Sequence, residues 1–397
     1  MYIGYSGGRY KRLEKLLSNP PLLIIAGAKG AVGSTVAATI AAIKTDPHSV
    51  LPWLTTGHWA ESVKSVMGME FAGWDVSLRS LIQAVEYHGV LPQEKFLPHE
   101  KYLNKIQIRQ APSGELSLPA YVEQLIRDIE DFKSLHPKTH PVLVNLLPAC
   151  QGVDLKGCTR LEELYSQADP RIFPDLAYVI AAISSKVPVV NFTSNAVELP
   201  LVLEEALRVC VPMCGRDGKT GQTYLKVVLA SALKARNLKV DGWYSLNILG
   251  NDDGINLADP RRAAGKVANK TELLDEILGY RVGQQYGTPS HKVVIDYYPP
   301  RGDCKEAWDV IDFAGLFGLP MSLRLNLQAR DSILAAPMVI DLARWMAALH
   351  GVGRSGPVPE LGFYFKKPMG YNPPVTFQDQ IAELHRLEND CRKKIRG

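Results

Sequence analysis

Two lysines and two adjacent aspartates share the stretch GNDDGINLADPRRAAGKVANK, residues 250–270. Lys266 and Lys270 are four positions apart, so in a helix both ammonium groups would extend from the same face. Like charges at this spacing repel slightly, which leaves two interpretations. The residues form either a solvated helix face or a site for a doubly charged anion or a developing oxyanion. From these residues alone, the solvated face is the simpler interpretation.

A glycine turn is the second candidate site. Gly27, Gly30 and Gly33 follow the apolar run LLIIA and open an apolar helix. In that context glycines let the backbone approach a pyrophosphate at a helix N-terminus. The acidic residue that would hold a ribose is expected about 20 positions later. The strand expected within HSVLPWLTTGHW ends without one, and Asp75 is the nearest candidate. A merely tight strand–helix turn remains the alternative.

The segments around the glycine turn predict a parallel sheet with helices on both faces. Buried strands are expected at PVLVNLL (141–147) and VPVVNFT (187–193). Helices are expected at 78–87, 119–134, 175–186 and 199–210. Strands that alternate with helices indicate right-handed crossovers in a doubly wound α/β fold.

The alternation of short strands with helices ends after about residue 218. A helix at 221–236 leads into long strand-like segments at 240–249, 292–299, 307–315 and 321–329. They predict an open antiparallel or mixed sheet, whose edges favour self-association. Helices at 332–350 and 375–394 follow, and residues 1–19 are expected to form a short polar arm.

The composition excludes several classes of function. With 46% hydrophobic residues, a net charge of only +4 and no basic run, the chain is not expected to bind nucleic acid. The apolar runs PPLLIIAGA and LAYVIAAI are too short for a membrane span, and no secretory signal is evident, so a cytoplasmic protein is expected. Cys210 and Cys214 have helical spacing but no neighbouring histidine, so no metal site is expected. The tripeptide Arg301-Gly302-Asp303 is not interpreted as an adhesion motif in such a chain.

Several ordered motifs resemble the inositol-3-phosphate synthase (myo-inositol-1-phosphate synthase) family. They are CGRDGKTGQTYLKVVLASAL, GWYSLNILGNDDGINL, the two lysines, GDCKEAWD, QARDSILAAPMVIDLARW and FYFKKPM. The resemblance is strong from about 187 to 370 and looser before that. NLLPACQG stands where the family has T-A-N-T-E, and Lys29 and Val32 stand where Gly and Asn are usual.

The resemblance implies cyclisation of D-glucose 6-phosphate to 1D-myo-inositol 3-phosphate with tightly bound NAD. The implied steps are oxidation at carbon 5, enolisation at carbon 6, aldol closure onto carbon 1 and reduction. It also implies a Rossmann-like domain at 1–218 with its arm at 1–19, an inserted α+β catalytic and oligomerisation domain at 219–328, and a return at 329–397. A homotetramer is expected.

The family motifs assign a role to each matching residue. The implied catalytic set is Lys266, Lys270, Lys305, Lys366, Asp217 and Asp331. The implied substrate-binding set is Thr220, Gln222, Leu249, Asn251, Asp253 and Leu257. The implied cofactor-binding set is Gly27, Gly30, Ala31, Val32, Gly33, Asp75, Ser194, Asn195, Asp217, Asp331 and Ser332.

Clustered lysines suit this chemistry because each is a compact charge that can stabilise an oxyanion and donate a proton. The motif favours Lys366 over the adjacent Lys367. Two alternatives remain open. One is a related cyclase that forms a five-membered ring from fructose 6-phosphate, and the other is an NAD-binding regulatory protein without turnover.

Overall fold

The computed structural model describes residues 19–54, 66–150, 153, 155, 157–286 and 290–396. The side chains of 263–271 and of 395–396 are outside this description. Of the expected N-terminal arm, only Asn19 lies within the described residues.

Seven strands form the main sheet, in the order β11-β6-β5-β4-β1-β2-β3, and all its pairings are parallel. The strands are β1 (Pro21–Ala26), β2 (Glu70–Asp75), β3 (Gln107–Gln110), β4 (His140–Asn145), β5 (Val189–Asn191), β6 (Pro212–Gly215) and β11 (Gly356–Pro357). Chain order reverses between β1 and β4, and ligands of open α/β sheets bind beside such a switch point.

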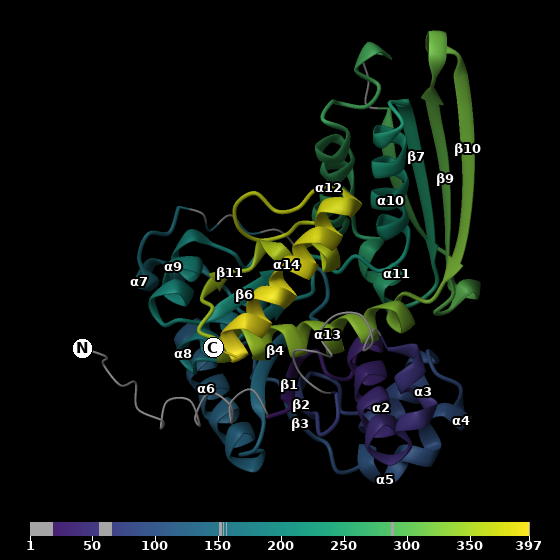
Figure 1. The fold of residues 1–397 in the computed structure, drawn as a ribbon. Helices are drawn as coiled ribbons and strands as arrows, with labels where there is room; N and C mark the ends of the chain where they lie inside the picture. The colour runs from purple at the N-terminus through teal and green to yellow at the C-terminus, as the bar shows by residue number, and fades with distance from the viewer. Residues whose placement is uncertain are drawn as a thin grey trace.

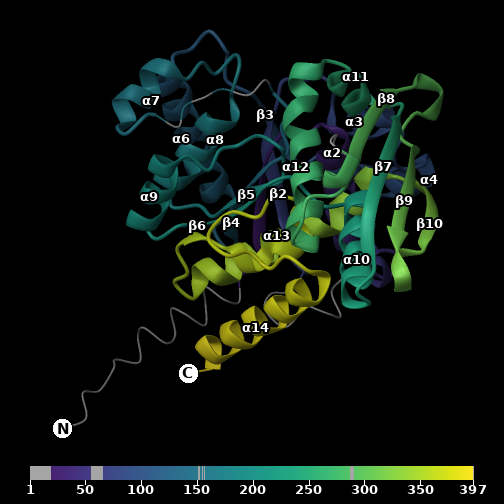
Figure 2. The same ribbon diagram turned by 90° about the horizontal axis from the view of Figure 1, so that it is seen from above.

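Helices cover both faces of this sheet, which confirms the predicted doubly wound α/β class (Figure 2). One face carries α2 (Ala31–Thr45), α3 (Leu81–His88) and α13 (Asp331–Gly351). The other carries α6 (Leu118–Leu135), α8 (Asp175–Ser184) and α9 (Pro200–Arg208). By length and composition α13 alone among the described helices passes for a membrane span, yet 78% of its apolar window is buried inside the fold.

A second sheet of four strands has the order β10-β9-β7-β8 and is mixed, as predicted. Its strands are β7 (Lys239–Leu249), β8 (His291–Tyr297), β9 (Lys305–Ala314) and β10 (Pro320–Ala329). Helices α10 (Gln222–Ala235) and α12 (Pro260–Leu278) cover one face (Figure 1) and pack on Val240, Trp243 and Ile311. The short helix α11 (Asp252–Leu257) joins β7 to α12.

One local prediction was wrong. The described part of 48–59 holds the turns Pro47–Ser49 and Leu51–Trp53 instead of a strand, because each turn contains a proline that cannot donate to a strand ladder. The second strand of the sheet is β2, which ends at Asp75. Cys210 and Cys214 do not share a helix, since the first follows α9 with φ 61° and the second lies in β6.

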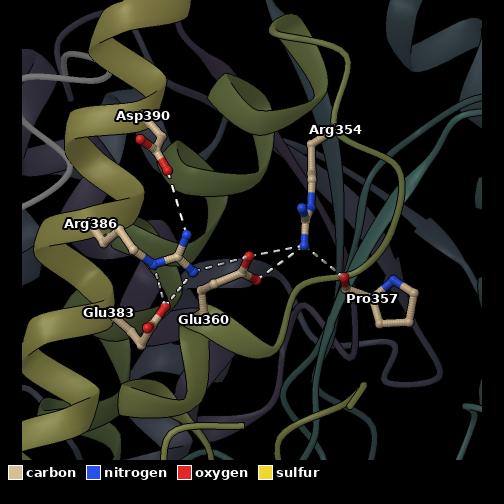
Figure 3. Close-up of polar contacts among 6 residues, drawn as sticks. All are labelled: Arg354, Pro357, Glu360, Glu383, Arg386 and Asp390. Carbon is tan, nitrogen blue, oxygen red and sulfur yellow. Dashed lines mark hydrogen bonds and ion pairs between the residues drawn. The ribbon is translucent and has the colours of Figure 1, made fainter. Parts of the chain in front are cut away.

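Hydrogen bonds and ion pairs connect the C-terminal helix α14 (Phe377–Arg396) to the segment that contains Lys366. The carboxylate of Glu360, in the turn Pro359–Tyr364, accepts hydrogen bonds from Arg354 and lies 3.9 Å from Arg386 of α14 (Figure 3). Arg386 also pairs with Glu383 and Asp390 along its own helix. This network fixes the turn that leads into the candidate site.

Candidate functional site

A cavity of about 410 Å³ lies where the two sheets approach each other. Its wall on the seven-stranded side is built from the loops that follow β1, β4 and β5, at the switch point of the sheet. Its other wall comes from the ends of β7 and β8, the start of α10 and α11. The glycine turn and the first part of the stretch 250–270, residues 251–257, therefore line the same cavity.

The glycine turn has the geometry of an anion cradle. A Cβ on Gly33 would lie 2.6 Å from the carbonyl oxygen of Gly27 and 2.7 Å from that of Ala28, so only glycine fits there. Gly27 itself has φ +85°, which favours glycine. Gly30 caps α2 without a side-chain hydrogen bond, and the first N–H groups of the helix have no partner within the helix. A pyrophosphate fits this N-terminus because it accepts hydrogen bonds and carries negative charge.

Asp75 lies behind the glycine turn and does not line the cavity. One carboxylate oxygen accepts a 2.7 Å hydrogen bond from the Lys29 backbone N–H, and the other accepts one of 2.8 Å from Ser77. The Lys29 ammonium donates to the Ser77 carbonyl oxygen at 2.7 Å. Asp75 and Lys29, which replaces a family glycine, thus hold the turn in place.

Two lysine–aspartate pairs line the cavity. The Lys305 ammonium donates to Asp331 at 2.9 Å, and the Thr220 hydroxyl donates to the other oxygen of Asp331 at 2.9 Å. Burial alone would raise the pKa of Asp331, but Lys305, Thr220 and the more distant Lys366 hold it well below its usual range. Asp331 is therefore ionised throughout the neutral range.

The second pair joins Lys366 to Asp217. The Lys366 ammonium lies 2.5 Å from the Asp217 carboxylate, and the two side chains are only 7% and 4% exposed. Their backbones are also joined, since the N–H of Lys366 donates to the carbonyl of Asp217 at 2.8 Å. Lys367 instead reaches Glu272 and Glu276 of α12.

Most of the predicted site residues line this cavity together. They are Gly27, Gly30, Ala31, Val32, Gly33, Ser194, Asp217, Thr220, Gln222, Leu249, Asn251, Asp253, Leu257, Lys305, Asp331, Ser332 and Lys366. Lys266 and Lys270 lie on α12, as their spacing predicted, but their side chains are among those outside the description.

Asn195 is behind the wall of the cavity. Its amide nitrogen donates to the Pro148 carbonyl and to Asp175, both at 2.9 Å, while its amide oxygen accepts from the Cys150 N–H. Asn195 thereby fixes the loop that departs from the family pattern, and part of this loop, 146–149, lines the cavity.

Three titratable residues of the lining, His88, Asp252 and Asp303, were absent from the predicted site residues. His88, at the end of α3, hydrogen-bonds the Lys29 carbonyl at 2.9 Å and lies 3.8 Å from Asp252. Asp303 lines the cavity two positions before Lys305. Because Asp303 lies in the turn before β9 and not on the strand, its spacing from Lys305 did not signal its position. Among the described residues, no group of three His, Cys, Asp or Glu could hold a metal ion.

A doubly wound sheet with a glycine turn and an inserted mixed sheet, both facing one charged cavity, defines the class of Rossmann-like α/β proteins. The model of the family described as myo-inositol-1-phosphate synthase matches residues 221–332. The chain is 33% identical to inositol-3-phosphate synthase 1 of Bacteroides thetaiotaomicron, over 87% of this chain and 89% of that protein. The chain therefore belongs to the myo-inositol-1-phosphate synthase family, which is a family of enzymes.

Other relatives are longer than this chain. Mouse inositol-3-phosphate synthase 1 is 29% identical over 75% of this chain and 60% of its own length. The chain likewise spans 58% of a probable inositol 3-phosphate synthase isozyme of Arabidopsis thaliana. Two solved structures confirm the fold at 19% identity. One is inositol-3-phosphate synthase from Caenorhabditis elegans, with TM-score 0.79 and coverage of 96% and 86% of the two chains. The other is a synthase-related protein from Thermotoga maritima, with TM-score 0.74 and coverage of 94% and 98%.

Proposed function

We propose that this protein cyclises D-glucose 6-phosphate to 1D-myo-inositol 3-phosphate, with NAD as a catalyst that is regenerated in each turnover. The names of its relatives support the reaction. The observation that carries the proposal is the meeting of the two Lys–Asp pairs with the glycine turn at one cavity. The sugar phosphate and the dinucleotide would both be bound there.

Lys305 and Lys366 would supply preformed positive charge to the reacting oxygens. Each ammonium is already held by a carboxylate, so little reorganisation is needed when negative charge develops on a substrate oxygen. A charge held in place in this way stabilises the transition state more than the free substrate.

The charge balance of the cavity supports a role for the remaining two lysines. Its described lining carries the carboxylates of Asp217, Asp252, Asp253, Asp303 and Asp331. Against them stand the ammonium groups of Lys305 and Lys366. A phosphate dianion needs further positive charge, and we propose that Lys266 and Lys270 of α12 provide it.

The residues present fit a dinucleotide. The N-terminus of α2 would hold the pyrophosphate, and Ser194 and Ser332 would lie along the bound molecule. Bound NAD would supply a reversible hydride acceptor. Thr220, Gln222 and Asn251 would orient the sugar, while the apolar Leu249 and Leu257 would exclude water from it.

We also propose that the protein acts as a homotetramer in the cytoplasm, built through the four-stranded sheet. The ten-residue edge strand β10 exposes Met321 and Leu323. On the sheet face opposite α10 and α12, Trp308 and Tyr244 are exposed. A long edge strand beside exposed aromatic residues favours association with another copy.

The proposed function is tested by incubating the purified protein with glucose 6-phosphate and no added reductant. The product is identified by NMR, and NAD released by denaturation is quantified. We expect inositol 3-phosphate and a stoichiometric content of NAD. A five-membered carbocycle from fructose 6-phosphate would support the alternative cyclase. NAD without turnover on either sugar would support the regulatory protein.

A further inference from the structure

A buried hydrogen-bond network behind the cavity surrounds the carboxylate of Asp309, on β9. Asp309 is 2% exposed and does not line the cavity. Its Oδ1 accepts hydrogen bonds from the indole N–H of Trp243 at 2.7 Å and from the hydroxyl of Ser245 at 2.5 Å, both on the neighbouring strand β7. Its Oδ2 accepts a 2.9 Å hydrogen bond from the side-chain nitrogen of Gln222, the first residue of α10. Both oxygens of this buried carboxylate are therefore satisfied.

The network fixes which end of the Gln222 amide faces Asp309. An ionised carboxylate can only accept hydrogen bonds, so the amide nitrogen of Gln222, and not its oxygen, must lie against it. Gln222 lines the cavity. Its amide oxygen is therefore left for a bound molecule.

A hydrogen-bond acceptor in this cavity complements its ammonium groups. Lys305 and Lys366 line the cavity and can only donate hydrogen bonds. A sugar hydroxyl that accepts from an ammonium group keeps its own proton, and that proton needs an acceptor. Lys305 and Asp309 are four positions apart on β9, so their side chains extend from the same face of the strand. One strand thus supplies a donor to the cavity and holds an acceptor beside it.

We propose that Asp309 is a positioning residue that acts through Gln222. It holds the Gln222 amide with the oxygen toward the cavity, where this oxygen accepts a hydrogen bond from a substrate hydroxyl, while Asp309 itself touches no ligand. The arrangement favours a ligand with a hydroxyl proton over one whose oxygens carry no proton. This inference rests on the proposed function for the class of ligand.

Exchanging donor and acceptor within the network tests this role. In Asp309→Asn, the indole of Trp243 still needs an oxygen because it can only donate, so the introduced amide nitrogen takes the place of Oδ2. Gln222 must then turn its own amide over, which brings its nitrogen to the cavity. In Asp309→Asn/Gln222→Glu, the introduced amide donates to the introduced carboxylate, whose other oxygen again faces the cavity as an acceptor.

Binding is measured at pH 8 on the purified protein, without turnover, for two probes. D-glucitol 6-phosphate has no aldehyde and cannot cyclise, and sulfate is a dianion without a proton to donate. Because both probes are dianions, a change in the charge of the cavity affects both affinities, and their ratio reports the hydroxyl groups. We expect Asp309→Asn to lower this ratio by about fivefold to a hundredfold, the usual effect of leaving a buried hydrogen-bonding group unsatisfied. The double variant should restore it.

Asp312→Asn, the same change at an exposed position of β9, is the matched control and should leave the ratio unchanged. An unchanged ratio in Asp309→Asn would overturn the inference, as would a double variant whose ratio stays low. If Asp309→Asn does not fold, the double variant decides alone, since a ratio like that of the wild type supports the inference and a lowered ratio overturns it. The expected pattern in a protein that makes no inositol phosphate would support the role of Asp309 and contradict the proposed function alone. A wild-type protein that binds sulfate as tightly as glucitol 6-phosphate would contradict both.

Discussion

Replacing Lys366 by methionine tests the buried ion pair that is proposed to act on the reacting oxygens. Its ammonium lies 2.5 Å from Asp217, and the two side chains are 7% and 4% exposed. Removing one partner of a buried pair leaves the other charge without compensation and typically costs about 3–5 kcal/mol of stability. Loss of a preformed charge aimed at the transition state typically lowers the turnover rate by about a hundredfold or more.

A second substitution separates the two effects. In Lys366→Met/Asp217→Asn the buried charge is gone, so we expect most of the lost stability to return while turnover stays low. Lys367→Met is the control. It breaks pairs with exposed glutamates of α12, which are worth at most about 1 kcal/mol, and should keep near-normal turnover. Urea denaturation and inositol phosphate formation measure the two properties. Full turnover in Lys366→Met, or its loss in Lys367→Met, would refute the assignment.

Three further predictions address the cofactor, the pH dependence of stability and assembly. Gly30→Val should fold but lose bound NAD, because the valine side chain would project from the N-terminus of α2, where the pyrophosphate is expected. An undiminished NAD content in the folded variant would show that the glycine turn does not bind the cofactor. Burial lowers the pKa of Lys219 to about 7 in the folded protein, from an ordinary value of 10.5. Folding therefore costs the most free energy near and below pH 7, where the unfolded chain keeps this lysine charged in water. The cost decreases toward pH 10, where the lysine also loses its proton in the unfolded chain. The stability of Lys219→Met relative to the wild type should therefore fall as pH rises from 7 to 10, and a constant difference in urea denaturation would disprove this. Leu323→Glu should reduce the assembled mass in light scattering, and a wild-type mass near 43.8 kDa would contradict the tetramer.

Buried apolar runs made part of the fold predictable from sequence. β1 is entirely apolar, β4 and β5 contain the apolar runs 142–144 and 189–190, and α13 has no polar face because it is enclosed by the sheet and α2. β2 escaped prediction because a glutamate and a glycine interrupt its apolar run. A Cβ on that glycine, Gly73, would lie 2.1 Å from the Ile25 carbonyl oxygen. This close approach between two strands cannot be predicted from the pattern of apolar and polar residues.

The residues of the candidate site that lie in recognisable sequence motifs were predictable. The motif match selected Lys366 over Lys367, and of the two only Lys366 is among the residues that line the cavity. Asp75 was predicted to bind the cofactor, but it does not line the cavity and instead accepts hydrogen bonds from the backbone N–H groups of Lys29 and Ser77. His88 and Asp303 were missed because each enters the cavity through tertiary contacts. For Asp303 these include the packing of the turn on Gly250, which local spacing does not encode.

The proposed reaction is an internal oxidation and reduction that leaves no net redox change. Glucose 6-phosphate deuterated at carbon 5 tests it most directly, in ordinary water with no added reductant. If the hydride taken from carbon 5 returns to the same carbon, the inositol phosphate should retain the deuterium at that single position, as NMR and mass spectrometry would show. Loss of the deuterium to water, or a deuterated product without a six-membered carbon ring, would contradict the account.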